Sequence, residues 1–172
     1  GGTAGRTTLN GEGLQHQDGH SHVLANTIPN CKAYDPAYGY EMAVVLRKGM
    51  KEMFEDNQNV FYYLTIENEN YEQPAMPKDC EDGIIKGMYK FESVETKGNK
   101  KTPRVQLLGA GAILNEVRAA AQMLKDDWGV ASDVWSVTSF NELAREGLHV
   151  ERWNRLHPDD KPRKAYVTQC LE

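Results

Sequence analysis

A regular alternation of strand-like and helix-like segments limits the folds open to the second half of this chain. RVQLLGAGAI, from Arg104 to Ile113, predicts a strand and a glycine turn, and residues 112–127 show an Ala- and Leu-rich helical pattern. A second strand (SDVWSVTSF), a second helix (NELAREGLHVERWNRL) and a third strand (KAYVTQCL) follow. Strands that alternate with helices of this length form parallel sheets with right-handed crossovers. The pattern predicts an α/β fold with a three-layer architecture.

The first half gives a similar but less regular pattern. IPNCKAYDPA predicts a strand ended by Asp35-Pro36, a pair that can cap a helix and occupy its first turn. In the helix that follows, apolar residues spaced by three and four predict one buried face: Met42, Val45, Leu46, Met50, Met53 and Phe54. The residues expected to face water are Lys48, Lys51, Glu52 and Glu55.

Two further patterns complete the expected organisation. The continuous apolar run NVFYYLTIEN predicts a central strand at residues 60–66, buried on both faces. Residues 96–103 lie in TKGNKKTPR, which is charged, contains Gly and Pro and has no periodicity. We therefore expect two domains, residues 1–95 and 104–172, joined by this linker.

Composition excludes several classes of function. The net charge of −5 comes without an acidic or basic block, so we expect no binding to nucleic acid or to a membrane surface. No apolar run could span a bilayer and no signal sequence is recognisable, which predicts a cytoplasmic protein. Cys31, Cys80 and Cys170 are far apart and odd in number, so we expect free thiols. The sequence does not begin with Met, and we expect it to be a piece of a longer chain.

GAGAIL, from Gly109 to Leu114, stands where a dinucleotide-binding fingerprint would stand. It lacks the third glycine, and Val137, Thr138 and Ser139 occupy the positions where an acidic ribose-binding residue should end the next strand. These departures favour a tight turn that lets the helix pack closely on the sheet.

GLQHQDGHSH, residues 13–22, concentrates three imidazoles and a carboxylate in one segment. Its side chains allow three interpretations. His16, His20 and His22 with Asp18 could bind zinc or another transition metal, as in a metal-dependent hydrolase. The segment could be a solvated polar loop that carries no chemistry, and a separate alternative for the whole chain is a stand-alone α/β interaction module. Alternatively, one histidine could donate a proton to an anionic substrate or stabilise its charge, because the pKa of imidazole lies near neutrality.

Longer motifs favour the third interpretation. TTLNGEGLQHQDGHSH, IPNCKAYDPAY, NENYEQPAMP and SVTSFNELAREG…ERWNRLHP resemble the bacterial homodimeric pyruvate dehydrogenase E1 family of the transketolase superfamily. The resemblance covers essentially all of the chain. It implies the latter half of a transketolase-like pyrimidine-binding domain in residues 1–95, and the first half of the transketolase C-terminal domain in residues 104–172.

The resemblance also implies an activity with its cofactors and partners. It implies oxidative decarboxylation of pyruvate with thiamin diphosphate and Mg²⁺, and transfer of the acetyl group to the lipoyl domain of the E2 dihydrolipoyl acetyltransferase. The enzyme would be a homodimer in the bacterial cytoplasm. The family's principal cofactor ligands have no counterpart in this sequence, so the chain alone is expected to be inactive and to hold no metal or cofactor.

Site residues follow from the same resemblance, position by position. GLQH places His16 where the comparable transketolase loop carries a histidine that touches the substrate, which makes it the candidate catalytic residue. Glu12 stands at a substrate-binding position of that loop. Asn68, Glu69 and Asn70 are expected to line the same cleft as substrate-binding residues on a different ground, because open α/β sheets build binding sites from polar residues that follow a buried strand. His20 and His22 have no matched role and are expected to support the loop.

Overall fold

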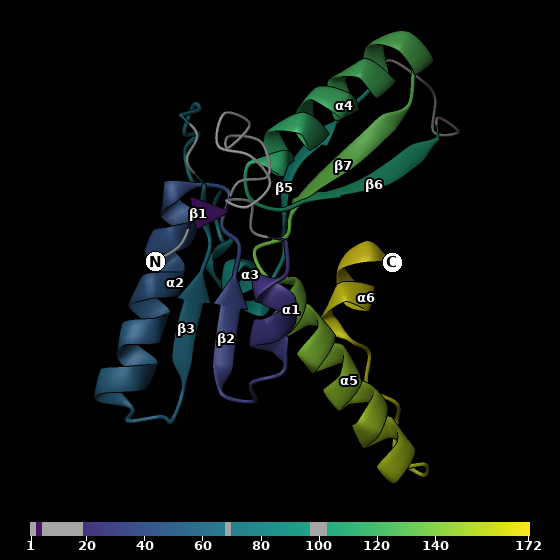
Figure 1. The fold of residues 1–172 in the computed structure, drawn as a ribbon. Coiled ribbons are helices and arrows are strands. Elements are labelled where there is room, and N and C mark those ends of the chain that lie inside the picture. The colour runs from purple at the N-terminus through teal and green to yellow at the C-terminus, as the bar shows by residue number, and fades with distance from the viewer. Residues whose placement is uncertain (1–2, 5–18, 68–69, 97–102) are drawn as a thin grey trace.

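The computed structural model describes residues 3–4, 19–67, 70–96 and 103–172 (Figure 1). The helices and strands follow in this order: β1 Thr3–Ala4, α1 Ser21–Asn26, β2 Cys31–Tyr34, α2 Gly39–Met50, η2 Lys51–Glu55, β3 Phe61–Leu64, β4 Ile66–Glu67, α3 Glu81–Lys86, β5 Tyr89–Val94, β6 Arg104–Gly109, α4 Ile113–Trp128, β7 Ala131–Ser136, α5 Phe140–Leu156 and α6 Tyr166–Leu171. The segment η2 is a π-helical turn that continues α2. Within the described residues, no helix is both long and apolar enough to cross a membrane.

Parallel pairing dominates the sheets, which confirms the predicted α/β class. β2 pairs with β3 in parallel, and β1 pairs with β4 in the same way. β6 and β7 are also parallel and are connected by α4, which packs on both of them (Figure 1). β5 lies antiparallel on the other edge of β7, so β7 is the central strand of this sheet. The division into domains at residues 96–103 stays a prediction, although β5, which precedes that segment, shares a sheet with β6, which follows it.

The segment KAYVTQCL is a helix, α6, so the prediction of a third strand there was wrong. Its apolar residues are spaced by four, with Tyr166 above Cys170 and Val167 above Leu171, and this spacing suits a helix better than a strand. All four pack against one buried cluster formed by Met88, Trp135, Val137 and Leu143. Packing against this cluster decides between two local patterns that the short segment allows.

The start of α2 also differs from the prediction. The helix begins at Gly39 rather than at Asp35-Pro36, and the backbone of Tyr38 is still extended. The carboxylate of Glu41 supplies the cap, since its Oε2 accepts from the backbone N–H of Ala37 at 2.6 Å and of Tyr38 at 3.2 Å. Asp35 is thereby left to contact other elements.

The buried face of α2 is rotated from the predicted one. Three residues expected inside, Leu46, Met50 and Phe54, are 46%, 60% and 74% exposed. Glu52, expected to face water, is buried instead. Similarly, the strand predicted to be buried on both faces corresponds to β3, which is only partly buried and whose one strand partner among the described residues is β2.

Lysines on either side explain why Glu52 is inside. Its carboxylate lies 2.7 Å from Nζ of Lys32 on β2 and 3.0 Å from Nζ of Lys48, and it accepts a 2.7 Å hydrogen bond from the hydroxyl of Tyr62. Burial alone would raise the pKa of Glu52, but these contacts outweigh it and hold the pKa at about 2. The ion pairs attach the end of α2 to the β2–β3 sheet.

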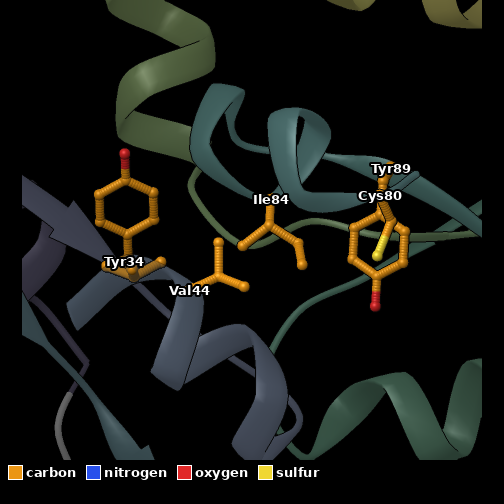
Figure 2. Packing of buried hydrophobic residues seen from close by; sticks show 6 residues of the cluster. Tyr34, Val44, Cys80, Ile84 and Tyr89 are labelled. Carbon is orange, nitrogen blue, oxygen red and sulfur yellow. The ribbon is translucent and has the colours of Figure 1, made fainter. Parts of the chain in front are cut away.

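Apolar packing joins α2 to α3, to β2 and to β5. Figure 2 shows Ile84 of α3 between Val44 of α2 on one side and Cys80 and Tyr89 on the other. Tyr34 of β2 belongs to the same buried cluster, and Ile84 is fully buried. Cys31, Cys80 and Cys170 are free, as predicted, with the first two buried.

The carboxylate of Glu41 links α2 to the sheet of β5 and β7. Its Oε1 accepts from the hydroxyl of Tyr89 on β5 at 2.7 Å and from the hydroxyl of Ser136 on β7 at 2.6 Å. Tyr89 is in turn 2.6 Å from the hydroxyl of Tyr40. Glu41 is completely buried, and this desolvation raises its pKa above the ordinary value although four hydrogen bonds oppose the shift.

Replacing Glu41 by Gln should remove a pH-dependent part of the stability. A carboxyl whose pKa is raised on folding stabilises the protein fully below its unfolded pKa, and this stabilisation is lost as the pH rises through the folded value. The melting temperature of the unmodified full-length protein should therefore fall relative to Glu41→Gln as the pH rises above about 4.3, the ordinary glutamate value. Thermal melts of both proteins across a pH series measure this.

Glu55→Gln is the matched control, because the Glu55 side chain lies on the same helical segment and is 73% exposed. The difference in melting temperature between Glu55→Gln and the unmodified protein should stay constant across the pH series. A constant difference for Glu41→Gln as well would contradict the assignment of a raised pKa to Glu41.

Candidate functional site

The ends of four strands meet at Asp35, which directly follows β2. Its backbone N–H donates to the carbonyl of Thr138 after β7 at 2.7 Å, and its carbonyl accepts from the N–H of Gly111 after β6 at 3.2 Å. Its carboxylate accepts a hydrogen bond from the hydroxyl of Thr65, which follows β3. Carboxyl ends of neighbouring strands are where open α/β sheets bind their ligands. This junction is therefore the candidate functional site.

His22 lies against this junction in the first turn of α1. Its Nε2 is 3.2 Å from Oγ1 of Thr65, and its ring meets that of Tyr63 edge-on, with 5.5 Å between the ring centres. The side-chain amide of Asn141, from α5, donates to the carbonyl of His22 at 2.8 Å. Both the ring and the backbone of this histidine are thus held by other elements.

The described residues on both sides of the His-rich segment reach the same place. On the N-terminal side, Thr3 pairs with Ile66 and Ala4 with Glu67 in the β1–β4 ladder. On the C-terminal side, His22 contacts Thr65, the residue directly before this ladder. The segment from residue 65 to residue 67 therefore anchors both flanks of the stretch that contains the predicted catalytic residue.

Most of the predicted site residues fall outside the part of the chain that the structure describes. These residues are Glu12, His16, Asn68 and Glu69. Asn70 is described and is exposed. Their assigned roles accordingly stay predictions.

Residues after Asn70 close the edge beside α2. Gln73 accepts from the N–H of Gly39 at 2.9 Å through its side-chain oxygen, and the hydroxyl of Tyr71 donates to the carbonyl of Ala37. An open cavity of about 310 Å³ lies here, lined by Pro36, Tyr38, Met42, Ile66, Tyr71 and Gln73. The NENYEQP motif thus contributes to the wall of a cavity next to the junction.

The structure gives no support to a metal site in its described parts. No cluster of three His, Cys, Asp or Glu side chains occurs among the described residues. His20 is exposed, and His22 directs Nε2 to Thr65. His16 and Asp18, the other proposed ligands, lie outside the described residues.

Sequence reasoning missed Thr65, Asn141 and the side-chain role of Asp35. In the strand motif NVFYYLTIEN, Thr65 stands between Leu64 and Ile66. A hydroxyl group in such an apolar stretch was a signal for a buried hydrogen bond, because buried polar groups are almost always hydrogen-bonded. Asn141 gave no signal, because its contact with His22 joins residues far apart in the chain.

Comparison with known proteins gives matches over the whole chain. Residues 1–74 match the family model "Pyruvate dehydrogenase E1 component middle domain", and residues 87–172 match "Transketolase-like TK C-terminal domain". The pyruvate dehydrogenase E1 component of Pseudomonas aeruginosa is 63% identical over 171 residues, which are 99% of this chain and 19% of that protein. The E1 components of Cupriavidus necator and Escherichia coli K12 are each 58% identical, and the chain again spans 19% of their length.

The chain belongs to the transketolase-like family. Within it, the chain is similar to an internal segment of the bacterial pyruvate dehydrogenase E1 component. Its fold agrees, since a transketolase variant of Pichia stipitis, solved with fructose 6-phosphate, superimposes with a TM-score of 0.55 over 76% of this chain and 17% of that one, at 18% identity.

The glycine turn of this transketolase-like C-terminal part has a packing role. A Cβ at Gly109 would lie 2.9 Å from Cα of Leu114 and 2.9 Å from Cγ2 of Val117, so only glycine lets α4 approach β6 so closely. Gly111 has a positive φ of 53° and donates its N–H to Asp35. The close approach of α4 to β6 agrees with the interpretation of GAGAIL as a tight turn, and the turn in addition docks onto the junction.

Three backbone N–H groups at turns beside the junction already have acceptors within the chain. The N–H of Gly111 donates to Asp35, that of Ala37 to Glu41 and that of Gly39 to Gln73. These three groups are therefore not free to bind a diphosphate.

Gly109→Ala should destabilise the protein, since the added methyl group must push α4 away from β6. Crowding of this kind costs about 1–3 kcal/mol. Gly147→Ala is the control, because a Cβ there meets nothing within 4 Å in the middle of α5, and such a change should stabilise the helix by about 0.5–1 kcal/mol. Thermal unfolding of the full-length variants compares them, and equal melting temperatures would contradict the packing role.

Proposed function

We propose that this chain is the part of a pyruvate dehydrogenase E1 component that forms one wall of its active site. The reaction would be oxidative decarboxylation of pyruvate, with the acetyl group passed to the lipoyl domain of the E2 acetyltransferase. The identity of 63% to the E1 component of Pseudomonas aeruginosa, over 99% of this chain, carries the proposal. The anchoring of the described residues on both flanks of the His-rich stretch, at the strand ends, supports it.

In this proposal His16 binds the substrate carboxylate or stabilises the charge that develops on it. Glu12, Asn68, Glu69 and Asn70 would line the same cleft. A positioned imidazole is suited to this role because it can donate a hydrogen bond to an anion and exchange a proton near neutral pH. The junction at Asp35 would supply a rigid base for the segment that carries it.

Thiamin diphosphate and Mg²⁺ would be bound mainly by residues outside this chain. The resemblance places the family's principal ligands elsewhere, and the backbone N–H groups of Gly111, Ala37 and Gly39 near the junction are used internally. The enzyme would act as a homodimer in the bacterial cytoplasm. Its partners would be pyruvate and the lipoyl domain of E2, without nucleic acid or membrane.

His16→Ala should lower kcat for pyruvate decarboxylation in the full-length enzyme by about 10²–10⁴-fold, which is typical of a positioned proton-transfer or charge-stabilising group. The affinity for thiamin diphosphate should change little, because the substitution touches no proposed cofactor ligand. Steady-state kinetics and a cofactor titration measure the two effects.

His20→Ala is the control for this experiment, since His20 is exposed and the resemblance assigns it no contact with the substrate. It should retain most of the activity. Equal and severe losses in both variants, together with a stoichiometric transition metal in the unmodified enzyme, would replace the proposal with the metal-site hypothesis.

The 172-residue chain by itself should bind thiamin diphosphate and Mg²⁺ negligibly. The reason is that cofactor sites of this kind lie between domains, and most of the polar groups that hold the two ends of the cofactor would be missing. Isothermal titration of the isolated chain tests this. Mg²⁺-dependent binding with one-to-one stoichiometry and micromolar affinity would show that the assignment of the cofactor ligands is wrong.

A further inference from the structure

We propose that Asp35, Thr65 and His22 form a positioning chain, in which Thr65 transmits the fixed orientation of the Asp35 carboxylate to the imidazole of His22. Through His22 the chain would hold the segment that leads back to His16. The inference deepens the proposed function and rests on its assignment of His16. Neither Asp35, Thr65 nor His22 would contact the substrate.

The direction of the hydrogen bonds follows from the donors available. The Thr65 hydroxyl has two acceptors within reach, Oδ1 of Asp35 and the carbonyl of Tyr34 at 3.4 Å. Its single proton goes to the nearer Asp35 carboxylate, which can only accept. The hydroxyl oxygen then accepts from His22, which requires the proton of the imidazole to be on Nε2. The chain therefore sets both the orientation and the tautomer of the ring.

Burial makes this arrangement specific. Thr65 is 1% exposed and Asp35 is 6% exposed, so water cannot easily replace either partner. Asp35 is fixed by backbone hydrogen bonds to Thr138 and Gly111, on the far side of the junction. The orientation of His22 thus depends on the docking of the β5–β7–β6 sheet against the end of β2.

A second contact restrains His22 from the other direction. Asn141 donates to its backbone carbonyl at 2.8 Å, so the ring is held from β3 and the main chain is held from α5. The β1–β4 ladder, which holds the opposite flank of the His-rich segment, begins at Ile66, next to Thr65. A displacement at Thr65 would accordingly affect both flanks of the segment.

The test uses the full-length enzyme and replaces Thr65 by Val, which keeps the shape and removes the hydroxyl. Since a misplacement of about 1 Å can cost on the order of 10²-fold in rate, we expect kcat to fall about tenfold with little change in KM. Thr65→Ser keeps the hydroxyl and should restore most of the rate. Thr27→Val is the matched control, because the Thr27 hydroxyl makes an exposed hydrogen bond at the end of α1.

The decisive measurement is a double-mutant cycle with His16→Ala. If Thr65 acts through His16, Thr65→Val should cause no further loss once His16 is gone. Asn141→Leu should show the same pattern with a smaller loss, and it serves as the test if Thr65→Val does not fold.

The outcomes distinguish the positioning chain from the proposed function. The positioning chain would be overturned if Thr65→Val left kcat unchanged. It would also be overturned if the loss in the double mutant equalled the product of the losses in the two single mutants. Either result would leave the proposed function intact. Turnover unchanged in His16→Ala alone would overturn the proposed site, and the positioning chain with it.

Discussion

The hydrogen bonds of the buried Glu41 carboxylate fix the position of α2 against the sheet formed by β5, β7 and β6. Among the described residues its hydrogen-bond donors are two backbone N–H groups and two hydroxyl groups, none of them a cation, so these four donors must replace the water that burial removes. A buried carboxylate that loses even one such donor is left with an expensive unsatisfied acceptor. The start of α2, the hydroxyl of Tyr89 and the hydroxyl of Ser136 must consequently keep their relative positions.

Glu52 shows how differently the same side chain behaves at the other end of the helical segment. There Lys32 and Lys48 more than compensate for burial and the pKa is low, whereas at Glu41 burial dominates and the pKa is raised. The two carboxylates attach the ends of one helical segment to different sheets. Together they explain why α2 is rotated away from the face that hydrophobic spacing predicted, with Leu46 and Phe54 exposed.

Local periodicity was sufficient to predict β6, α4, β7 and α5, because each of these segments shows a strand or helix pattern of hydrophobic residues along its whole length. It failed for α6, where a short apolar segment suits both a strand and a helix until the cluster around Trp135 selects one. It also failed at Asp35-Pro36, because the sequence cannot show that Glu41 caps the helix. The candidate site came from long motifs rather than from periodicity, and the contacts of Thr65 and Asn141 required the fold.

The predicted linker at 96–103 separates parts that depend on each other. β5 precedes it, yet the strand partner of β5 among the described residues is β7, which follows it. Asp35 likewise precedes it, and both backbone groups of Asp35 bond to residues that follow it. A unit ending at residue 95 would leave the polar edge of β5 unpaired and the carbonyl and N–H of Asp35 without these partners. The junction that orients His22 therefore exists only when both sides of the linker are folded together.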